Sequence, residues 1–83
     1  MAWILMGGCD GFGNDAYVAC DNIFTDYKKA YDAGIAMTKK SVSDFSESEY
    51  RKHAKFAKKY NAATYEGGYP FYYAVPVKVA IID

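Results

Sequence analysis

Three side chains in this 83-residue chain could take part in nucleophilic or zinc chemistry: the single histidine, His53, and the two cysteines, Cys9 and Cys20. A cysteine nucleophile needs a base within hydrogen-bond reach, and zinc needs a set of ligands at recurrent spacings. The separation of His53 from the cysteines matches neither arrangement. We therefore predict that the protein is not an enzyme and has no cofactor or metal. We expect His53 at the border of a helix face, with its ring packed and its nitrogens in water.

Two further sets of residues near the start of the chain invite a ligand interpretation. Oxygen-bearing side chains suited to calcium occur at Asp10, Asn14, Asp15 and Asp21. The calcium loop with its glycine and distant glutamate is absent, however. Glycines that a phosphate-binding loop would use occur at Gly7, Gly8, Gly11 and Gly13. The lysine of such a loop and its following helix are missing, so turn formation accounts for both sets.

The charges are sorted along the chain, although they cancel overall. Residues 1–27 contain Asp but no Lys or Arg, whereas residues 51–59 contain basic side chains and no acid. Charge sorted in this way concerns partners and association rates rather than fold. The basic residues share one face of the helix expected there: Arg51, Lys52, Lys55, Lys58 and Lys59. A solvated helix face, a site for an acidic protein and a site for nucleic acid phosphates are all consistent with this pattern.

Apolar runs at both ends of the chain predict three strands. Residues 2–6 are apolar and too few for a helix, and residues 16–20 follow a turn-rich segment, which together predict an N-terminal hairpin. From Phe71 onward apolar residues alternate, which predicts the third strand. Pro76 cannot donate a backbone hydrogen bond, so this strand lies at a sheet edge, contains a bulge, or turns that position outward.

The position of the hairpin turn decides whether the two thiols can lie opposite each other. If it turned at Asn14 and Asp15, Cys9 would lie opposite Cys20 and a cross-strand disulfide could form. Disulfides are rare in cytosolic proteins, so we expect two small, buried, reduced cysteines instead.

The first predicted helix covers residues 25–40, with Thr25 as its N-cap. One stripe of this helix is largely apolar, whereas charged side chains occupy the opposite stripe. The largely apolar stripe consists of Tyr27, Ala30, Tyr31, Gly34 and Thr38. Because glycine destabilises a helix interior by roughly 1 kcal/mol, Gly34 indicates that the helix approaches the sheet closely.

The second predicted helix covers residues 47–62 and has the clearest local signature in the chain. Ser46 and Glu49 have the spacing of a capping box, and Phe45 and Tyr50 that of a hydrophobic staple. Its inner stripe consists of Tyr50, Ala54, Ala57 and Tyr60, opposite the basic residues.

The order strand, strand, helix, helix, strand (ββααβ) predicts a single α+β domain of residues 1–83. We expect a two-layer sandwich with a three-stranded, mainly antiparallel sheet, in which the last strand runs antiparallel to the second. With both helices on one face, the other face is apolar and uncovered, as at a protein contact or a homodimer interface. The residues expected to reach a partner there are Trp3, Tyr72 and Ile82. Tyr69 is a further candidate, from an aromatic cluster near the last strand that consists of Tyr65, Tyr69, Phe71, Tyr72 and Tyr73.

The chain is 52% hydrophobic and 18% aromatic, which is too apolar and aromatic for disorder. It has no apolar run long enough for a membrane span and no signal-peptide pattern, so we expect a cytoplasmic protein. In size, composition and element order it resembles the small accessory proteins of bacteriophages and mobile elements. That resemblance implies a non-enzymatic inhibitor that binds a host or defence protein stoichiometrically. The alternative is a nucleic-acid-binding module that uses the basic helix and exposed tyrosines.

Overall fold

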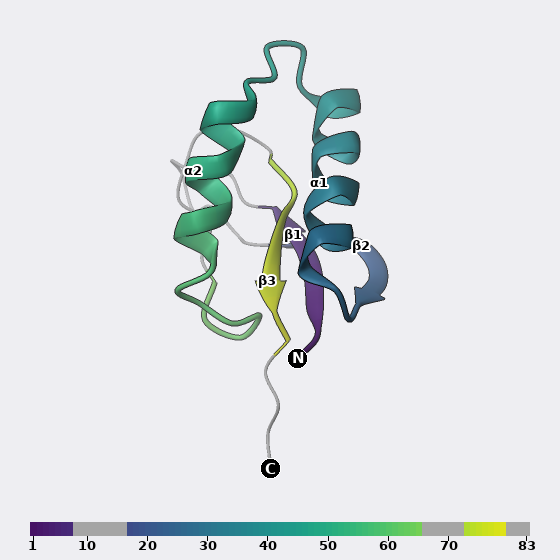
Figure 1. Ribbon diagram of the computed structural model, residues 1–83, viewed down its shortest axis with the longest axis vertical. Coiled ribbons are helices and arrows are strands. Elements are labelled where there is room, and N and C mark those ends of the chain that lie inside the picture. The colour runs from purple at the N-terminus through teal and green to yellow at the C-terminus, as the bar shows by residue number, and fades with distance from the viewer. Residues whose placement is uncertain (8–16, 66–72, 80–83) are drawn as a thin grey trace.

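The structure, a computed structural model, describes residues 1–7, 17–65 and 73–79. The predicted α+β class and ββααβ order are confirmed (Figure 1). The elements are β1 (Trp3–Gly7), β2 (Tyr17–Phe24), α1 (Tyr27–Ser41), α2 (Glu47–Ala57) and β3 (Val75–Lys78).

The three strands form one sheet in the order β2-β1-β3, with β1 antiparallel to both neighbours. Because β2 and β3 are both antiparallel to β1, they run parallel to each other. The prediction that the last strand runs antiparallel to the second is therefore wrong. Pro76 lies opposite Leu5 on β3 at the edge of this order, which agrees with the edge position expected from its missing donor. Beyond that edge, the Ala62 N–H donates to the Lys78 carbonyl oxygen at 2.7 Å.

Strand β2 is longer than predicted and contains an irregularity. Ile4 pairs with Ile23 and Met6 pairs with Val18, so residues 19–22 bulge opposite a single position of β1. A bulge of this kind disrupts regular pairing and bends the strand.

The two helices cover opposite faces of the sheet, and the prediction that both lie on one face is wrong. Leu5 packs in one buried cluster with Ala30 of α1, whereas Met6 packs in a second cluster with Ala54 of α2. Successive residues of a strand point to opposite faces. In Figure 1, β3 accordingly stands between α1 and α2.

The reason for this arrangement lies in β3 and the residue before it. Ala74 and Pro76 are buried on the face of Leu5, and Val75 and Val77 are buried on the face of Met6. Because both faces of this segment are apolar, each needs a helix to exclude water. The apolar face expected to remain open is therefore covered at β1 and β3.

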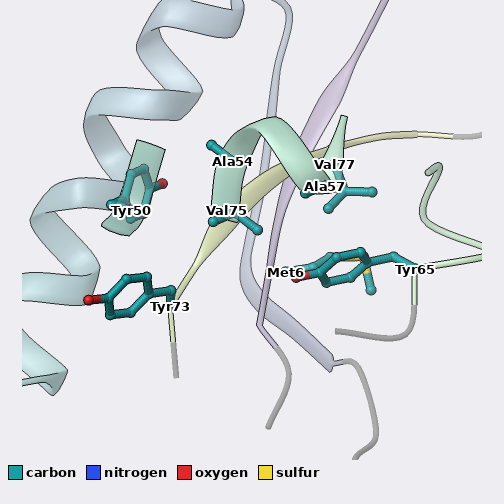
Figure 2. Packing of buried hydrophobic residues seen from close by; sticks show 8 residues of the cluster. All are labelled: Met6, Tyr50, Ala54, Ala57, Tyr65, Tyr73, Val75 and Val77. Atoms are coloured by element: carbon teal, nitrogen blue, oxygen red, sulfur yellow. The ribbon is translucent and has the colours of Figure 1, made fainter. Parts of the chain in front are cut away.

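The larger buried cluster joins α2 to β3 and to residues near them in space (Figure 2). Its members are Met6, Tyr50, Ala54, Ala57, Tyr65, Tyr73, Val75 and Val77. The predicted inner stripe of the second helix is confirmed for Tyr50, Ala54 and Ala57, which are all fully or almost fully buried, whereas Tyr60 is half-buried and lies beyond the end of α2.

The helix ends follow local hydrogen bonding. The N-cap of α1 is Asp26 rather than Thr25, and its carboxylate accepts a hydrogen bond from the Lys28 N–H at 3.0 Å. Ser46 caps α2 as predicted, through a hydrogen bond from the Glu49 N–H. However, α2 ends at Ala57 instead of residue 62. Four residues after that end, Asn61 starts a turn, since its side-chain oxygen accepts hydrogen bonds from the N–H groups of Ala63 and Thr64.

Both helices meet at the backbone of Ala74. Its N–H donates to Thr38 Oγ1 of α1 at 3.0 Å, and its carbonyl oxygen accepts from Tyr50 Oη of α2 at 2.6 Å. Gly34 lies beside this contact, and a Cβ atom there would come within 2.6 Å of the same carbonyl oxygen. The close approach predicted from Gly34 is therefore confirmed. We call Gly34, Thr38, Tyr50 and Ala74 the Ala74 contact.

Several sequence predictions concern residues outside the described part of the chain. These are the glycine and aspartate turns at residues 8–15, and the thiol of Cys9 with its disulfide. The same holds for the partner residues Tyr69, Tyr72 and Ile82. The other thiol, Cys20, is free and half-buried against the cluster around Leu5.

Candidate functional site

The outer face of α2 and its C-cap Lys58 carries a concentration of positive charge. The basic residues predicted to share this face are all exposed: Arg51, Lys52, Lys55, Lys58 and Lys59. The helical repeat puts them opposite the buried stripe, so burial of the alanines directs the cations to solvent. Among the described residues, the only ion pair that any of them makes joins Lys52 Nζ to Glu49 Oε1 at 3.6 Å. Most of this charge therefore has no carboxylate partner within the described ranges.

A groove of about 320 Å³ runs between α1 and α2. Arg51, Lys55 and Lys58 lie on its α2 side, and Tyr27 and Tyr31 lie on its α1 side. Ala54 completes the lining, and its small side chain leaves room between the two helices. We call this the interhelical groove. It combines a cationic wall with an aromatic wall, an arrangement suited to a ligand that has both negative charge and apolar surface.

Neighbouring aromatic rings hold the tyrosines of the groove in place. The ring of Trp3 packs edge-on against Tyr27 at a centroid distance of 4.7 Å. Tyr31 packs edge-on against Tyr50 at 5.2 Å, which connects the groove to the core. Burial, with a smaller contribution from Tyr31, raises the pKa of Tyr27, so its hydroxyl is protonated and can donate a hydrogen bond at neutral pH.

Lys58 already lies over one of these rings. Its Nζ is 4.1 Å from the centroid of Tyr27, within the range of a cation–π contact. The contact holds a flexible lysine at the groove, where its ammonium can exchange the ring for an anion of a ligand.

A second, slightly smaller hollow lies on the other side of Lys55. It measures about 290 Å³ and is lined by Lys52, Lys55, Phe56 and Lys59. Lys59 Nζ lies 5.9 Å from the centroid of the Phe56 ring. Lys55 lines both hollows and therefore links them into one basic surface.

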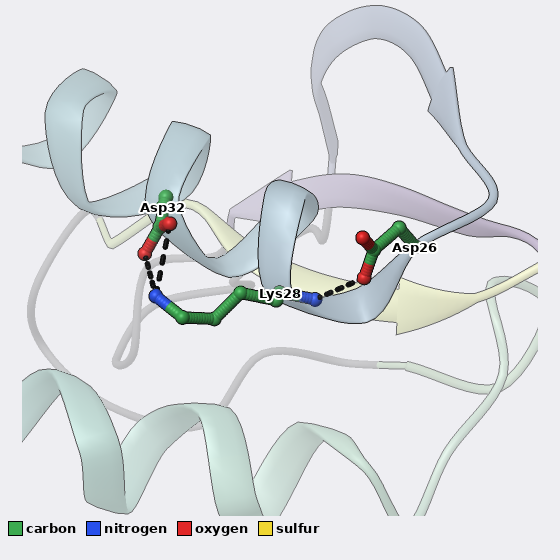
Figure 3. Close-up of polar contacts among 3 residues, drawn as sticks. All are labelled: Asp26, Lys28 and Asp32. Carbon is green, nitrogen blue, oxygen red and sulfur yellow. Dashed lines mark hydrogen bonds and ion pairs between the residues drawn. The ribbon is translucent and has the colours of Figure 1, made fainter.

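The two acids nearest in sequence to the groove tyrosines, Asp26 and Asp32, both interact within their own helix. Lys28 Nζ contacts both carboxylate oxygens of Asp32 at 2.9 and 3.0 Å, and Asp26 caps the same helix (Figure 3). The hydrogen bond and charge of Asp32 raise the pKa of Lys28. Asp32 therefore has its own cation on α1, which leaves the lysines of α2 available to a ligand.

His53 is buried within α2, not at the border of its faces, so that prediction is wrong. Its ring centroid lies 5.3 Å from that of Tyr73 on the inner side of the helix. Burial lowers the pKa of His53, and the charge of Glu49 opposes this effect. In the described ranges, no group of three His, Cys, Asp or Glu side chains could hold a metal ion.

The predicted partner residues within the described ranges fall into three places. Arg51, Lys55 and Lys58 share the interhelical groove, while Lys52 and Lys59 line the second hollow. Trp3 is half-buried and packs behind Tyr27. Sequence reasoning missed Tyr27 and Tyr31 as site residues, because their spacing on the inner stripe of α1 indicates a buried role. Only their position at the edge of that stripe exposes them to the groove.

Two tyrosines of the aromatic cluster near the last strand lie in the described part of the chain. Tyr65 and Tyr73 are almost completely buried, and burial raises the pKa of Tyr65 to about 12. These two rings therefore belong to the core and are inaccessible to a nucleobase or a protein partner.

One apolar part of the sheet is exposed among the described residues. Val18 and Ile23 of β2 have relative exposures of 50% and 63%, on the face shared with Ile4 and Met6. Within the described part of the sheet, exposed apolar surface thus lies on β2, on the far side of β1 from β3.

Comparison with protein-family models, with curated proteins and with solved structures gave no match. Neither of the helices in the described ranges is long and apolar enough to cross a membrane.

Proposed function

We propose that the protein is a non-enzymatic interaction module that binds an acidic protein stoichiometrically. The observation that carries this proposal is the cationic wall of the interhelical groove, where Arg51, Lys55 and Lys58 have no ion-pair partner among the described residues. Such a surface accelerates association with a negatively charged partner. An inhibitor of the kind that phages encode would act in this way, by occupying a functional surface of a host or defence protein.

A cytoplasmic site of action is part of this proposal.

A nucleic-acid-binding module is the second candidate, and the aromatic wall of the groove favours it. Tyr27 and Tyr31 lie beside cations, and aromatic rings next to basic side chains are typical of single-strand binding. Nucleic acid binding would weaken steeply with salt. The overall charge is zero and the pI is about 6.5, however, whereas nucleic-acid-binding domains are usually strongly basic.

Affinity capture from candidate host lysates, with and without nuclease, separates the two candidates. We expect one protein to be recovered in stoichiometric amount after nuclease treatment. The charge-reversed pair Lys55→Glu and Lys58→Glu should lose it. The matched control pair Lys29→Glu and Lys40→Glu, which changes the net charge equally at exposed positions of α1, should retain it.

Two results would contradict the proposal. Recovery that disappears with nuclease favours nucleic acid, and equal recovery by both charge-reversed pairs removes α2 from the interaction. The mass of the free chain by light scattering is the accompanying measurement. A dimer that captures no other protein would instead assign the apolar surface of β2 to a homodimer interface.

A further inference from the structure

We propose that the ligand of the interhelical groove is a short, extended acidic peptide segment with an aromatic residue, whose alternate side chains face the two helices. This inference rests on the proposed function and specifies the chemistry of the partner at the same site.

The spacing of the cations matches an extended peptide. Arg51, Lys55 and Lys58 follow one another at intervals of four and three residues along α2. With a rise of 1.5 Å per residue, their attachment points are separated by about 6 and 4.5 Å along the helix axis. Alternate side chains of an extended chain are about 6.6 Å apart on one side. Carboxylates at every second position of a peptide can therefore meet successive cations, since lysine and arginine side chains reach over the small difference.

The opposite wall suits an aromatic side chain. Residues between the carboxylates point to the other side of an extended peptide, which faces Tyr27 and Tyr31 in the groove. Trp3 and Tyr50 restrain these two rings from behind, at centroid distances of 4.7 and 5.2 Å. A ring from the ligand can thus pack against aromatic surface that is already ordered, which lowers the entropy cost of binding. The small Ala54 leaves space for it.

Charge at the end of the groove favours a short peptide over a nucleic acid strand. Glu47 is exposed in the first turn of α2, about one helical turn before Arg51 and on the same side of the helix. A polyphosphate chain that continued along the helix beyond Arg51 would meet this carboxylate and be repelled. A segment with only a few acidic residues ends before it reaches Glu47.

The test uses synthetic capped peptides and the full-length protein. The probe ESEFESE presents Glu on one side of an extended chain and Phe on the other. We expect it to bind with shifts of backbone amide NMR signals in Tyr27, Tyr31 and residues 51–58. Replacement of the Phe by Ala should weaken binding by roughly fivefold. The rearranged peptide EESFSEE has the same composition without the alternation, and it should bind roughly tenfold more weakly than the probe.

Protein variants then assign the contact to the groove. Arg51→Gln should weaken binding of the probe by roughly tenfold. Lys29→Gln, which removes an exposed positive charge of α1 outside the groove, should change binding by less than about twofold. Both positions are exposed, so neither variant should impair folding.

Three outcomes would overturn the inference. The first is no binding of the probe, and the second is equal affinity for ESEFESE and EESFSEE. The third is tighter binding of an oligothymidylate of the same length, with NMR shifts at Tyr27 and Tyr31, which would also favour the nucleic acid alternative. If the lysate experiment still recovers a protein that depends on Lys55 and Lys58, the proposed function stands although the peptide chemistry is wrong.

Discussion

On its inward side α2 places Tyr50, Ala54 and Ala57 against β3, whereas its outward side presents Arg51 and Lys55 to the groove and solvent. The inward side is dense, buried and hydrogen-bonded to the Ala74 backbone. On the outward side, Arg51 and Lys55 have no ion-pair partner in the described ranges. Substitutions on the inward side should therefore change folding, and those on the outward side should change association alone.

The largest effect is expected at Gly34. In Gly34→Ala the new Cβ would collide with Tyr50 Oη and with the Ala74 carbonyl oxygen, and the latter belongs to the backbone. Such overpacking should cost about 3 kcal/mol or more in the free energy of unfolding, measured by urea denaturation. Ala36→Gly, at an exposed position of the same helix, should cost only about 1 kcal/mol. Equal losses for the two variants would show that the Ala74 contact is not tightly packed.

The next largest effect is expected from the hydrogen bonds to Ala74. Tyr50→Phe leaves the buried Ala74 carbonyl oxygen without its donor, and Thr38→Val leaves the N–H without its acceptor. Each should lower the free energy of unfolding by about 1–3 kcal/mol. Tyr31→Phe is the control, since its hydroxyl makes no hydrogen bond within the described residues, and it should cost less than about 0.5 kcal/mol.

A double variant tests whether the two helices act together at this residue. If both hydrogen bonds hold the same backbone unit in place, the combined loss for Tyr50→Phe and Thr38→Val should differ from the sum of the single losses. Strict additivity, measured by the same denaturation, would mean that α1 and α2 are anchored independently.

A smaller effect is expected from pH, through His53. Burial lowers its pKa in the folded state below the value of 6.5 typical of an unfolded chain. The unfolded chain therefore binds more protons between these two values, and stability falls as the pH drops through that window. The melting temperature should be constant just above pH 6.5 and decrease below it. In His53→Gln that decrease should be absent until carboxylates titrate. An unchanged pH profile in this variant would contradict a buried neutral His53.

The smallest effect on stability is expected from the groove itself. Lys55→Gln together with Lys58→Gln should change the free energy of unfolding by less than about 0.5 kcal/mol, because both side chains are exposed. The same pair should reduce the association rate with the captured partner and the dependence of that rate on salt. A large loss of stability would show that the two sides of α2 are not separable.

Local features were predictable where neighbouring residues decide them. Ser46 caps the start of α2 because its hydroxyl oxygen accepts a hydrogen bond from the Glu49 N–H, only three residues further along the chain. The helical repeat alone separates Tyr50 and Ala54 from Arg51 and Lys55. For the same reason, the cationic wall of the groove was visible in the sequence.

The amino-acid sequence by itself determined the α+β order, the start of α2, the two stripes of that helix and the need for close packing at Gly34. Only the tertiary structure decided that β3 pairs with β1, that α1 and α2 cover opposite faces, and that Tyr27 and Tyr31 face Arg51 and Lys55. The alternating apolar residues of β3 would be the same whether this strand paired with β1 or with β2. The apolar stripe of a helix likewise does not specify which face of the sheet the helix packs against. Those choices depend on contacts between distant segments, such as the hydrogen bonds from Thr38 and Tyr50 to Ala74, which no local pattern encodes.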